Sequence, residues 1–281
     1  MQTVQDSAGL RAAIRAWRSQ GRTVGLVPTM GNLHAGHFAL IKLARARVDR
    51  VVASVFVNPT QFGPNEDFAR YPRTLAQDQA GLAEHACDLL FAPDVATMYP
   101  YGPQQSVSIH VPQITAVLEG AHRPGHFDGV ATVVCKLFNL VQPDLAVFGQ
   151  KDYQQLKVIE RMVRDLALPV KVLSAPTVRE ADGLALSSRN QYLSAEERQR
   201  APLIHATLQQ MRQLLHKGHA RPIVEEAART HLERAGFVVD YAAIRRAEDL
   251  QEPEPDERSG LVALIAARLG QTRLIDNLLL D

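Results

Sequence analysis

Two histidines interrupt an otherwise apolar stretch, VPTMGNLHAGHFALI, at residues 27–41. If His34 and His37 lie in the first turn of a helix, both imidazoles project from the same side and can donate hydrogen bonds to a phosphate. Gly31 and Gly36 let the backbone approach a ligand closely or take φ > 0, and free N–H groups at a helix start favour anions. The pattern predicts a phosphate site. A tight turn capped by histidines is the simpler alternative, and a metal site would need a third ligand that this neighbourhood does not offer.

Two further motifs carry groups suited to phosphate. FGQKD ends an apolar run, so Lys151 can reach a phosphate and Asp152 a ribose or an amine. LSSRN offers two hydroxyls and an arginine, a set suited to clamping β- and γ-phosphates. Each has an ordinary alternative, a solvated Lys–Asp pair for the first and a helix-capping turn for the second. The histidine stretch is neither a GxxxxGK[ST] loop nor a GxGxxG fingerprint, which argues against ordinary kinase or dinucleotide chemistry.

The elements that must position these groups alternate along the first part of the chain. Apolar runs predict strands at TVGLVPTM, VVASVFVN, DLLFAP, DLAVFG and VKVLSAP. Helical patterns are expected at about residues 37–44, 73–86, 127–141 and 151–166. Continuously apolar strands that alternate with helices imply a parallel sheet covered on both faces. We expect an α/β fold with a doubly wound, Rossmann-like sheet, in which ligands bind at the carboxyl ends of the strands.

The pattern changes after about residue 177. Polar helical stretches at about 194–218 and 223–235 are followed by apolar runs at FVVDYAAI, GLVALIAARLG and TRLIDN. Helices followed by antiparallel strands suggest a smaller α+β domain. We expect a nucleotide-binding domain over residues 1–176 and a C-terminal α+β lid domain over residues 177–281.

Composition narrows the class of protein. The 281 residues are 46% hydrophobic and 22% charged, the balance of a soluble globular protein. A formal charge of +1 gives no global field toward nucleic acid or a membrane. There is no signal-peptide pattern, and no run approaches the roughly 18 apolar residues of a membrane span. Cys87 and Cys135 lie outside any zinc-site spacing, so we expect buried thiols in a reducing, cytoplasmic compartment.

Several ordered motifs resemble one known family. HAGH is similar to the HxGH signature of the nucleotidyltransferase superfamily, in which a later motif closes over the triphosphate, as LSSRN would. PTMGNLHAGH, FVNPTQF, YPRT, HFDGVATVV, FGQKDYQQ, PTVREADGLALSSRN and TRLIDN together resemble the pantoate–β-alanine ligase family, from about residue 22 to the C-terminus. The resemblance implies an ATP-dependent ligase. Pantoate would attack the α-phosphate of ATP to give pantoyl adenylate and pyrophosphate, and the amine of β-alanine would then displace AMP to give pantothenate.

The resemblance also implies residue roles. His37, His34 and Lys151 would be catalytic, with His37 the acid or hydrogen-bond donor. Val178 and Leu186 would pack near the adenine or its ribose. The residues expected to bind ATP are Met30, Gly31, Asn32, Leu33, His34, Ala35, Gly36, His37, Gly149, Gln150, Lys151, Asp152, Val178, Leu186, Ser187, Ser188 and Arg189. Many relatives have Glu in place of Gln150, a difference expected to change only local polarity.

The pantoate pocket should combine amides with apolar walls. Gln61 and Gln155 match the family's pantoate-binding glutamines, and Asn58 would assist them. The candidate walls for the two methyl groups of pantoate are Phe62 and either Phe127 or Val130.

The remaining expectations concern metal and partners. A triphosphate implies Mg²⁺, held mainly by phosphate oxygens and water. Asp78 is the candidate protein ligand, although a solvated aspartate on a helix face is at least as good an interpretation. Arg123 and His126 are near-site candidates without an assigned role. The family implies a homodimer that acts on small molecules, with no nucleic-acid or membrane partner.

Two other functions stay open. The first is another adenylyl-transferring enzyme of the same superfamily that acts on a different carboxylic acid or nucleotide. Gln61 and Gln155 argue against it, as does the lack of a basic stripe for RNA. The second is a non-catalytic nucleotide-binding protein on the same fold. The presence of both histidines, Lys151 and the Ser-Ser-Arg motif argues against that function.

Overall fold

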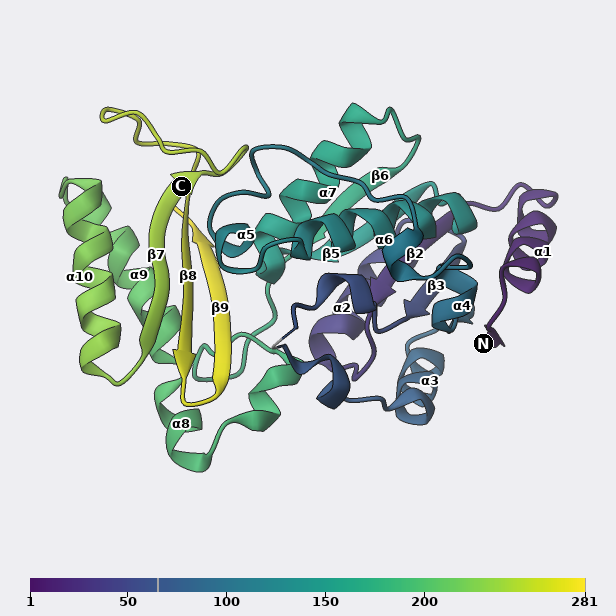
Figure 1. Cartoon of the computed structure of the whole chain (residues 1–281), viewed down its shortest axis with the longest axis horizontal. Helices are drawn as coiled ribbons and strands as arrows, with labels where there is room; N and C mark the ends of the chain where they lie inside the picture. Colours follow the sequence, from purple (N-terminus) through teal and green to yellow (C-terminus); the bar gives the residue numbers. More distant parts are fainter. Residues whose placement is uncertain (65, 281) are drawn as a thin grey trace.

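The computed structural model describes residues 1–64 and 66–280, which form two sheets flanked by helices (Figure 1). The larger sheet has six parallel strands in the order β1-β4-β3-β2-β5-β6. Its strands are β1 (Gln2–Val4), β2 (Val24–Thr29), β3 (Arg50–Val55), β4 (Leu89–Phe91), β5 (Leu145–Gly149) and β6 (Lys171–Ala175). From β2 the chain winds outward through β3 to β4 and then returns to β5 on the other side of β2. The β2–β5 junction is therefore the topological switch point at which such sheets bind ligands.

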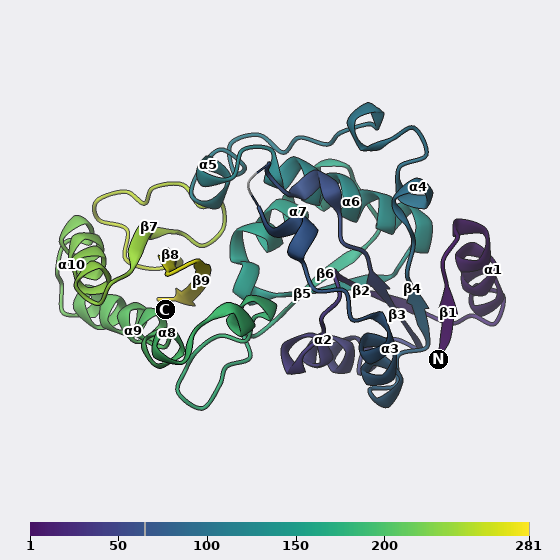
Figure 2. The ribbon, with the colours of Figure 1, turned by 60° about the horizontal axis from the view of Figure 1, so that its bottom comes forward.

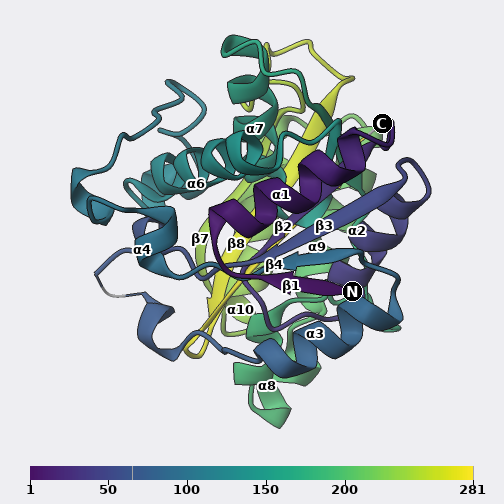
Figure 3. The same ribbon diagram turned by 90° about the vertical axis from the view of Figure 1, so that its right-hand side faces the viewer.

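Helices cover both faces of the larger sheet (Figures 2 and 3). On one face α1 and α7 both pack against α6, and on the other face α2 packs against α3 and the strands. Because both faces are covered, the central strands are mostly apolar and their buried residues follow one another without alternation. The helices of this part are α1 (Ser7–Arg18), α2 (Ala35–Arg45), α3 (Leu75–Glu84), α4 (Val95–Met98), α5 (Glu119–His122), α6 (His126–Val141) and α7 (Tyr153–Asp165).

The second sheet is antiparallel, in the order β7-β8-β9. Its strands are β7 (Val238–Arg246), β8 (Leu261–Leu269) and β9 (Thr272–Leu279), and its helices are α8 (Ala195–Arg200), α9 (Leu203–His216) and α10 (Arg221–Arg234). α9 and α10 pack on one face with a core of their own. Ala243, Val262 and Leu264 face the other way and join the core of the first sheet. Strand β8 is thus buried on both faces, which explains its unbroken apolar run.

The predicted fold class is confirmed, with corrections in detail. The helix expected over 194–218 is two helices, because Pro202, which has no N–H to donate, lies where α8 ends and α9 begins. Strand β1 and helices α4 and α5 were not predicted, since three or four residues carry no readable periodicity. Cys87 is buried as expected, whereas Cys135 is partly exposed. No helix within the described ranges combines the length and apolarity that crossing a bilayer requires.

Short 3₁₀ turns carry several of the residues that matter below. They are η1 (Pro59–Gln61), η2 (Asp67–Arg70), η3 (Pro103–Gln105), η4 (Gln150–Asp152) and η5 (Ser188–Tyr192). Three of them, η1, η4 and η5, lie in loops that border the switch point and contribute side chains to its pocket.

Candidate active site

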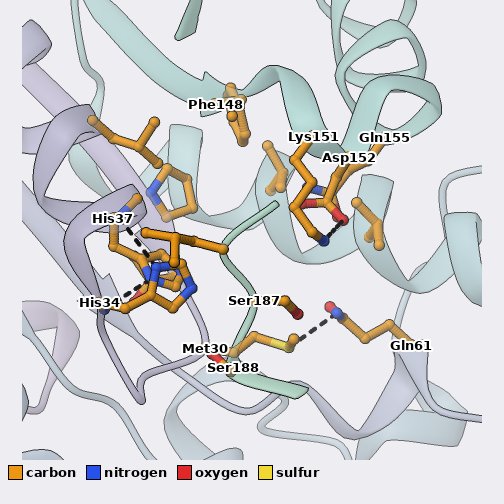
Figure 4. A pocket seen from close by; sticks show the side chains of 18 of the residues that line it. Met30, His34, His37, Gln61, Phe148, Lys151, Asp152, Gln155, Ser187 and Ser188 are labelled. Atoms are coloured by element: carbon orange, nitrogen blue, oxygen red, sulfur yellow. Dashed lines mark hydrogen bonds and ion pairs between the residues drawn. The ribbon is translucent and has the colours of Figure 1, made fainter. Parts of the chain in front are cut away.

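A pocket opens at the switch point, between the carboxyl ends of β2 and β5, helix α6 and the loop that follows β6 (Figure 4). Fifteen of the residues expected to bind nucleotide or pantoate line it: Met30, His34, Gly36, His37, Asn58, Gln61, Gly149, Lys151, Asp152, Gln155, Val178, Leu186, Ser187, Ser188 and Arg189. The fold thus gathers motifs that are separated by up to about 150 residues in sequence. Gly31, Asn32, Leu33, Ala35 and Gln150, also expected at the nucleotide, are not among the lining residues.

The two histidines form a reciprocal cap at the start of α2. His34 Nδ1 accepts a hydrogen bond from Gly36 N at 3.2 Å, and His37 Nδ1 accepts one from His34 N at 3.3 Å. Since Nδ1 is an acceptor in both rings, each neutral imidazole carries its proton on Nε2. The capping turn that stood as the alternative is confirmed, and it is compatible with the predicted phosphate site because the cap leaves an Nε2–H donor on each ring.

Burial keeps both rings neutral. It lowers the pKa of His34 to about 4, and the Lys151 ammonium acts in the same direction. It also lowers the pKa of His37 to about 3, with His34, whose ring centroid is 4.2 Å away, as the next cause. At neutral pH the histidines are hydrogen-bond donors without charge, so the cations that face the pocket are Lys151 and Arg189.

Asp78 supports the turn from behind. Its carboxylate accepts hydrogen bonds from Leu33 N at 2.8 Å, Asn32 N at 3.1 Å and Thr74 Oγ1 at 3.2 Å, and the residue is 2% exposed. The alternative of a solvated helix-face aspartate is wrong. The role as a metal ligand stays a prediction that this geometry does not favour, because the oxygens already accept three donors and Asp78 does not line the pocket.

The glycines of the turn have distinct steric reasons. Gly31 has φ +85°, and a Cβ there would lie 3.0 Å from Asp78 Oδ2. A Cβ on Gly36 would lie 2.9 Å from His34 Cε1, so a larger residue would displace the imidazole. The sequence predicted close approach of the backbone to a ligand. The expected positive φ is confirmed at Gly31, and the structure shows in addition that both glycines leave room for side chains of the protein.

The opposite wall comes from β5 and the loop after β6. Lys151 Nζ lies 3.6 Å from Asp152 Oδ1, and the lysine side chain is 19% exposed. Ser187 Oγ accepts from Arg189 N at 3.3 Å and so caps η5. Ser188 Oγ donates to Asn32 O at 3.1 Å, which joins this loop to the histidine turn. The motif is therefore a capping turn that also directs Arg189 toward the pocket, over the ring of Tyr71.

The predicted pantoate end of the pocket is built around a buried amide. Asn58 is 1% exposed, and its Nδ2 donates to Gln61 Oε1 and Gly129 O, both at 3.1 Å. Its Oδ1 accepts from Tyr99 Oη at 2.7 Å and from Thr60 Oγ1 at 3.0 Å. Asn58 borders the pocket, but its polar atoms are already used, so its role is to hold Gln61.

The backbone approaches closely where α6 meets η1. A Cβ on Gly129 would lie 2.4 Å from Thr60 O, so only glycine lets α6 pack against the turn that carries Gln61. From that turn, Gln61 Nε2 donates to Met30 Sδ at 3.1 Å, and Gln155 faces the same pocket from α7.

Arg123 and His126, which had no assigned role, support Gln61 from outside the pocket. Arg123 Nη1 lies 3.1 Å from His126 Nε2, and His126 Nδ1 lies 2.8 Å from Gln61 O. Burial lowers the pKa of His126 to about 4, with the Arg123 charge as the next cause. The neutral ring therefore accepts from Arg123 and donates to the Gln61 carbonyl. Arg123 in turn forms an ion pair with Glu66.

The apolar walls were predicted only in part. Val130 lines the pocket, whereas Phe62 and Phe127 do not. Phe62 packs against Phe68 and Tyr71 instead, and Phe127 is buried in the core. The other apolar walls were not predicted: Leu40, Phe56, Tyr71, Val133, Val134, Leu137 and Phe148. Five of them belong to the quoted motifs, but which side chains face the pocket depends on how α6 and the loops pack on the sheet.

Fold and pocket together define a class of protein: a doubly wound α/β protein whose switch-point pocket presents neutral donors and two cations to a polyphosphate, beside an amide-lined apolar recess. The model of the Pantoate-beta-alanine ligase family matches residues 2–279, so the chain belongs to that family.

Similar proteins match this chain over nearly its whole length. The chain is 60% identical over 278 residues to the pantothenate synthetase of Xanthomonas axonopodis pv. citri (strain 306), in an alignment that covers 99% of both chains. The crystal structure of pantothenate synthetase from Thermus thermophilus matches with a TM-score of 0.93 at 51% identity, covering 100% of this chain and 99% of that one. The Francisella tularensis pantoate-beta-alanine ligase, complexed with beta-gamma ATP and beta-alanine, matches with a TM-score of 0.82 at 34% identity, covering 99% and 97%.

Proposed function

We propose that the switch-point pocket binds ATP and pantoate side by side and that this ligase uses them to make pantothenate from pantoate and β-alanine. ATP is the co-substrate. The observation that supports this most directly is the convergence of two Nε2–H donors, Lys151 and the Ser-Ser-Arg loop on a pocket whose other end presents Gln61 and Gln155. One end suits a triphosphate and the other a small hydroxy acid.

In the first step an oxygen of the pantoate carboxylate bonds to the α-phosphorus of ATP while the bond to pyrophosphate breaks. Charge builds on the phosphate oxygens, and donors fixed beforehand stabilise that charge most. We propose that His34 and His37 supply these donors from Nε2 and that Lys151 balances the charge. Ser187, Ser188 and Arg189 would clamp the β- and γ-phosphates, and Val178 and Leu186 would contact the adenosine.

In the second step the amine of β-alanine attacks the acyl carbon of pantoyl adenylate. The bond to AMP breaks, an amide forms and the nitrogen loses a proton. The adenylate must be kept from water until then. We propose that Gln61 and Gln155 hold pantoate through its hydroxyl and carboxyl groups while Val130, Val134 and Phe148 surround its methyl groups.

Magnesium is part of the proposal, with Asp78 proposed as a support of the histidine turn in place of a metal ligand. The oxygens of Asp78 already accept three hydrogen bonds behind the histidine turn. Phosphate oxygens and water supply most ligands of Mg²⁺ in nucleotide sites. When bound, the ion would neutralise charge on the leaving pyrophosphate. We also keep as proposals the homodimer and the domain boundary at 176/177, which light scattering and limited proteolysis would test.

The test is release of AMP and pyrophosphate from ATP and pantoate, with and without β-alanine, in the wild type and in His37→Ala. We expect pantoate-dependent pyrophosphate release without β-alanine, limited to about one equivalent, and continuous turnover with it. His37→Ala should lower kcat by about 100- to 1,000-fold, the usual effect of removing one donor to a developing oxyanion.

The matched control is His219→Ala, because His219 is exposed in the segment after α9 and does not line the pocket. It should behave like the wild type. Nucleotide binding without any pantoate-dependent turnover would reject the substrate and favour another acid of the same chemistry. Binding without any turnover on a range of carboxylic acids would favour a non-catalytic nucleotide-binding protein.

A further inference from the structure

Two adjacent residues near the end of β9 contact both phosphate-facing segments of the pocket, although neither residue lines the pocket itself. Asp276 is 5% exposed and Asn277 is 4% exposed. Successive side chains of a strand point to opposite faces. The pair therefore reaches in two directions, Asp276 toward the loop after β6 and Asn277 toward the end of β5.

Asn277 holds the turn that carries Lys151. Its Nδ2 donates to Gln150 O at 2.9 Å and to Lys151 O at 2.8 Å. These carbonyls belong to η4, the turn between β5 and α7, and the Lys151 side chain leaves from it toward the pocket. The buried amide of Asn277 thus fixes the main chain at Lys151 without taking part in the lining of the pocket.

Asp276 holds the base of the loop that carries the Ser-Ser-Arg motif. It accepts a two-pronged bond from Arg179, at 2.6 Å from Nη1 and 2.9 Å from Nη2. Arg179 also donates to Gly183 O at 3.1 Å and pairs across the loop with Ala185. Arg179 directly follows Val178, and Ala185 directly precedes Leu186. Val178 and Leu186 both line the pocket, so the bridge between Arg179 and Ala185 is adjacent to two lining residues.

The two contacts are connected. Asn277 N donates to Asp276 Oδ1 at 2.8 Å, and Arg179 Nη2 lies 3.5 Å from Asn277 O. A shift of Arg179 therefore disturbs the orientation of the Asn277 main chain and, through it, the Lys151 turn. Residues that share such a network have coupled effects when they are changed.

We propose that Asp276 and Asn277 act as positioning residues for ATP: together they set the separation between Lys151 and the Ser187–Arg189 clamp. This inference rests on the proposed function only in that ATP is the ligand. The C-terminal sheet would then take part in the phosphate site without contacting ATP. We call Asp276 and Asn277, with their contacts to the two segments, the bracket. An error of about 1 Å in the position of a reacting group costs roughly 100-fold in rate, so loss of the bracket should affect catalysis and not only folding.

The experiment measures ATP binding by calorimetry, pantoate-dependent pyrophosphate release and Tm for Asn277→Leu, Arg179→Lys and the double variant. Asn277→Leu keeps the side-chain volume roughly unchanged but removes the donor, and Arg179→Lys keeps the charge but removes the two-pronged geometry. We expect each single variant to bind ATP about 10-fold more weakly and to have a similarly lower kcat/KM for ATP, with the KM for β-alanine unchanged. The fold-loss of ATP affinity in the double variant should be smaller than the product of the two single fold-losses.

The control for a merely structural role is Glu225→Gln. Glu225 lies on α10 and accepts hydrogen bonds from two residues of β7 in the C-terminal sheet, from Ile244 N at 2.6 Å and from Arg245 Nη1 at 3.2 Å. These bonds do not involve either of the segments that face the phosphates. It should lower Tm and leave ATP affinity unchanged. The proposal would be rejected if Asn277→Leu and Arg179→Lys behaved like Glu225→Gln, with a lower Tm but an ATP affinity within twofold of the wild type. If Asn277→Leu does not fold, Arg179→Lys decides alone.

Failure of the proposed function is separable from failure of the bracket. A wild type that binds ATP but shows no pantoate-dependent release rejects the substrate, while the comparison of ATP affinities still tests the bracket. Normal wild-type turnover with unchanged ATP affinity in the variants rejects the bracket alone.

Discussion

The two walls of the pocket are held in place by contacts of different range. The histidine turn is fixed from the part of the chain that forms the larger sheet, by its own reciprocal cap and by Asp78 on the adjacent helix α3. The loop after β6, which carries the proposed clamp (Ser187–Arg189), is fixed from the C-terminal sheet through Arg179 and Asp276. It meets the other wall through the bond from Ser188 to Asn32. The first wall is therefore ready before ATP arrives, whereas the second depends on how the C-terminal sheet sits. This difference predicts that changes in the first wall affect kcat and changes in the second affect ATP affinity.

Apart from loss of the His37 side chain itself, the largest effect is expected for Gly36→Ala. The new Cβ would lie 2.9 Å from His34 Cε1 and force the imidazole away from its position. We expect kcat to fall about 100-fold with little change in Tm, because alanine is a good helix former. Gly9→Ala, near the start of α1, is the control, since its nearest contact would be an ordinary 3.5 Å. Equal activity of the two variants would show that the His34 ring position is unimportant.

Asp78→Asn should come next, with an effect on both activity and stability. The amide replaces an acceptor by a donor opposite the N–H groups of Asn32 and Leu33. We expect a loss of about 1–3 kcal/mol in the free energy of unfolding, the cost of unpaired buried polar groups, together with a lower kcat. The measurements are urea unfolding and activity as a function of Mg²⁺ concentration.

The magnesium titration decides between the two roles of Asp78. A positioning role leaves the half-saturating Mg²⁺ concentration unchanged, whereas a metal ligand would shift it upward. Asp94→Asn is the stability control, because Asp94 caps α4 through Thr97 N, and asparagine caps a helix as well as aspartate does.

A smaller effect is expected on the second wall for Arg189→Ala. Losing charge-assisted hydrogen bonds to phosphate should raise the KM for ATP about 10-fold or somewhat more, with kcat changed less than in Gly36→Ala. Arg198→Ala, which removes a partly exposed arginine of α8 that pairs with Asp182, should leave the KM for ATP unchanged. A fall in kcat with an unchanged KM for ATP in Arg189→Ala would contradict the division between the two walls.

The smallest effect is on the pH dependence of stability. The pKa of His34 is lowered to about 4 and that of His37 to about 3, from 6.5. Between pH 6.5 and about 4 the unfolded chain therefore binds protons that the folded rings do not, so the free energy of unfolding falls as pH falls through this range. Thermal melts from about pH 7.5 to about 4.5 should show a shallower decline in His37→Asn than in the wild type, whereas exposed His219→Asn should follow the wild type. Parallel declines would mean that His37 is not held neutral.

The sequence predicted most of the features that depend on local patterns of residues. The alternation of apolar runs and helices indicated the sheet and its helices, and the motifs named fifteen residues that do line one pocket. The misassignments share one cause. Phe62 and Phe127 stand beside the right motifs but point elsewhere, because the direction of a side chain depends on how its turn or helix packs.

Supporting residues were the least visible in the sequence. Asp78 was interpreted as a surface aspartate or a metal ligand, and Arg123 and His126 had no role, because each acts through contacts with residues between 45 and 65 positions away. TRLIDN was noted as a motif, but nothing in it indicated that Asp276 and Asn277 reach two different loops.

By itself, then, the sequence determined the fold class and the chemical groups of the site, since these follow from periodicity and from residue types at fixed spacing. The family was indicated by the resemblance of its ordered motifs. Only the tertiary structure decided which nitrogen of each histidine carries the proton, which carboxylate supports the turn and which strand holds the clamp. Those properties depend on burial, on the hydrogen bonds of the folded histidine turn and on hydrogen bonds between distant segments, and all of these exist only once the chain has folded.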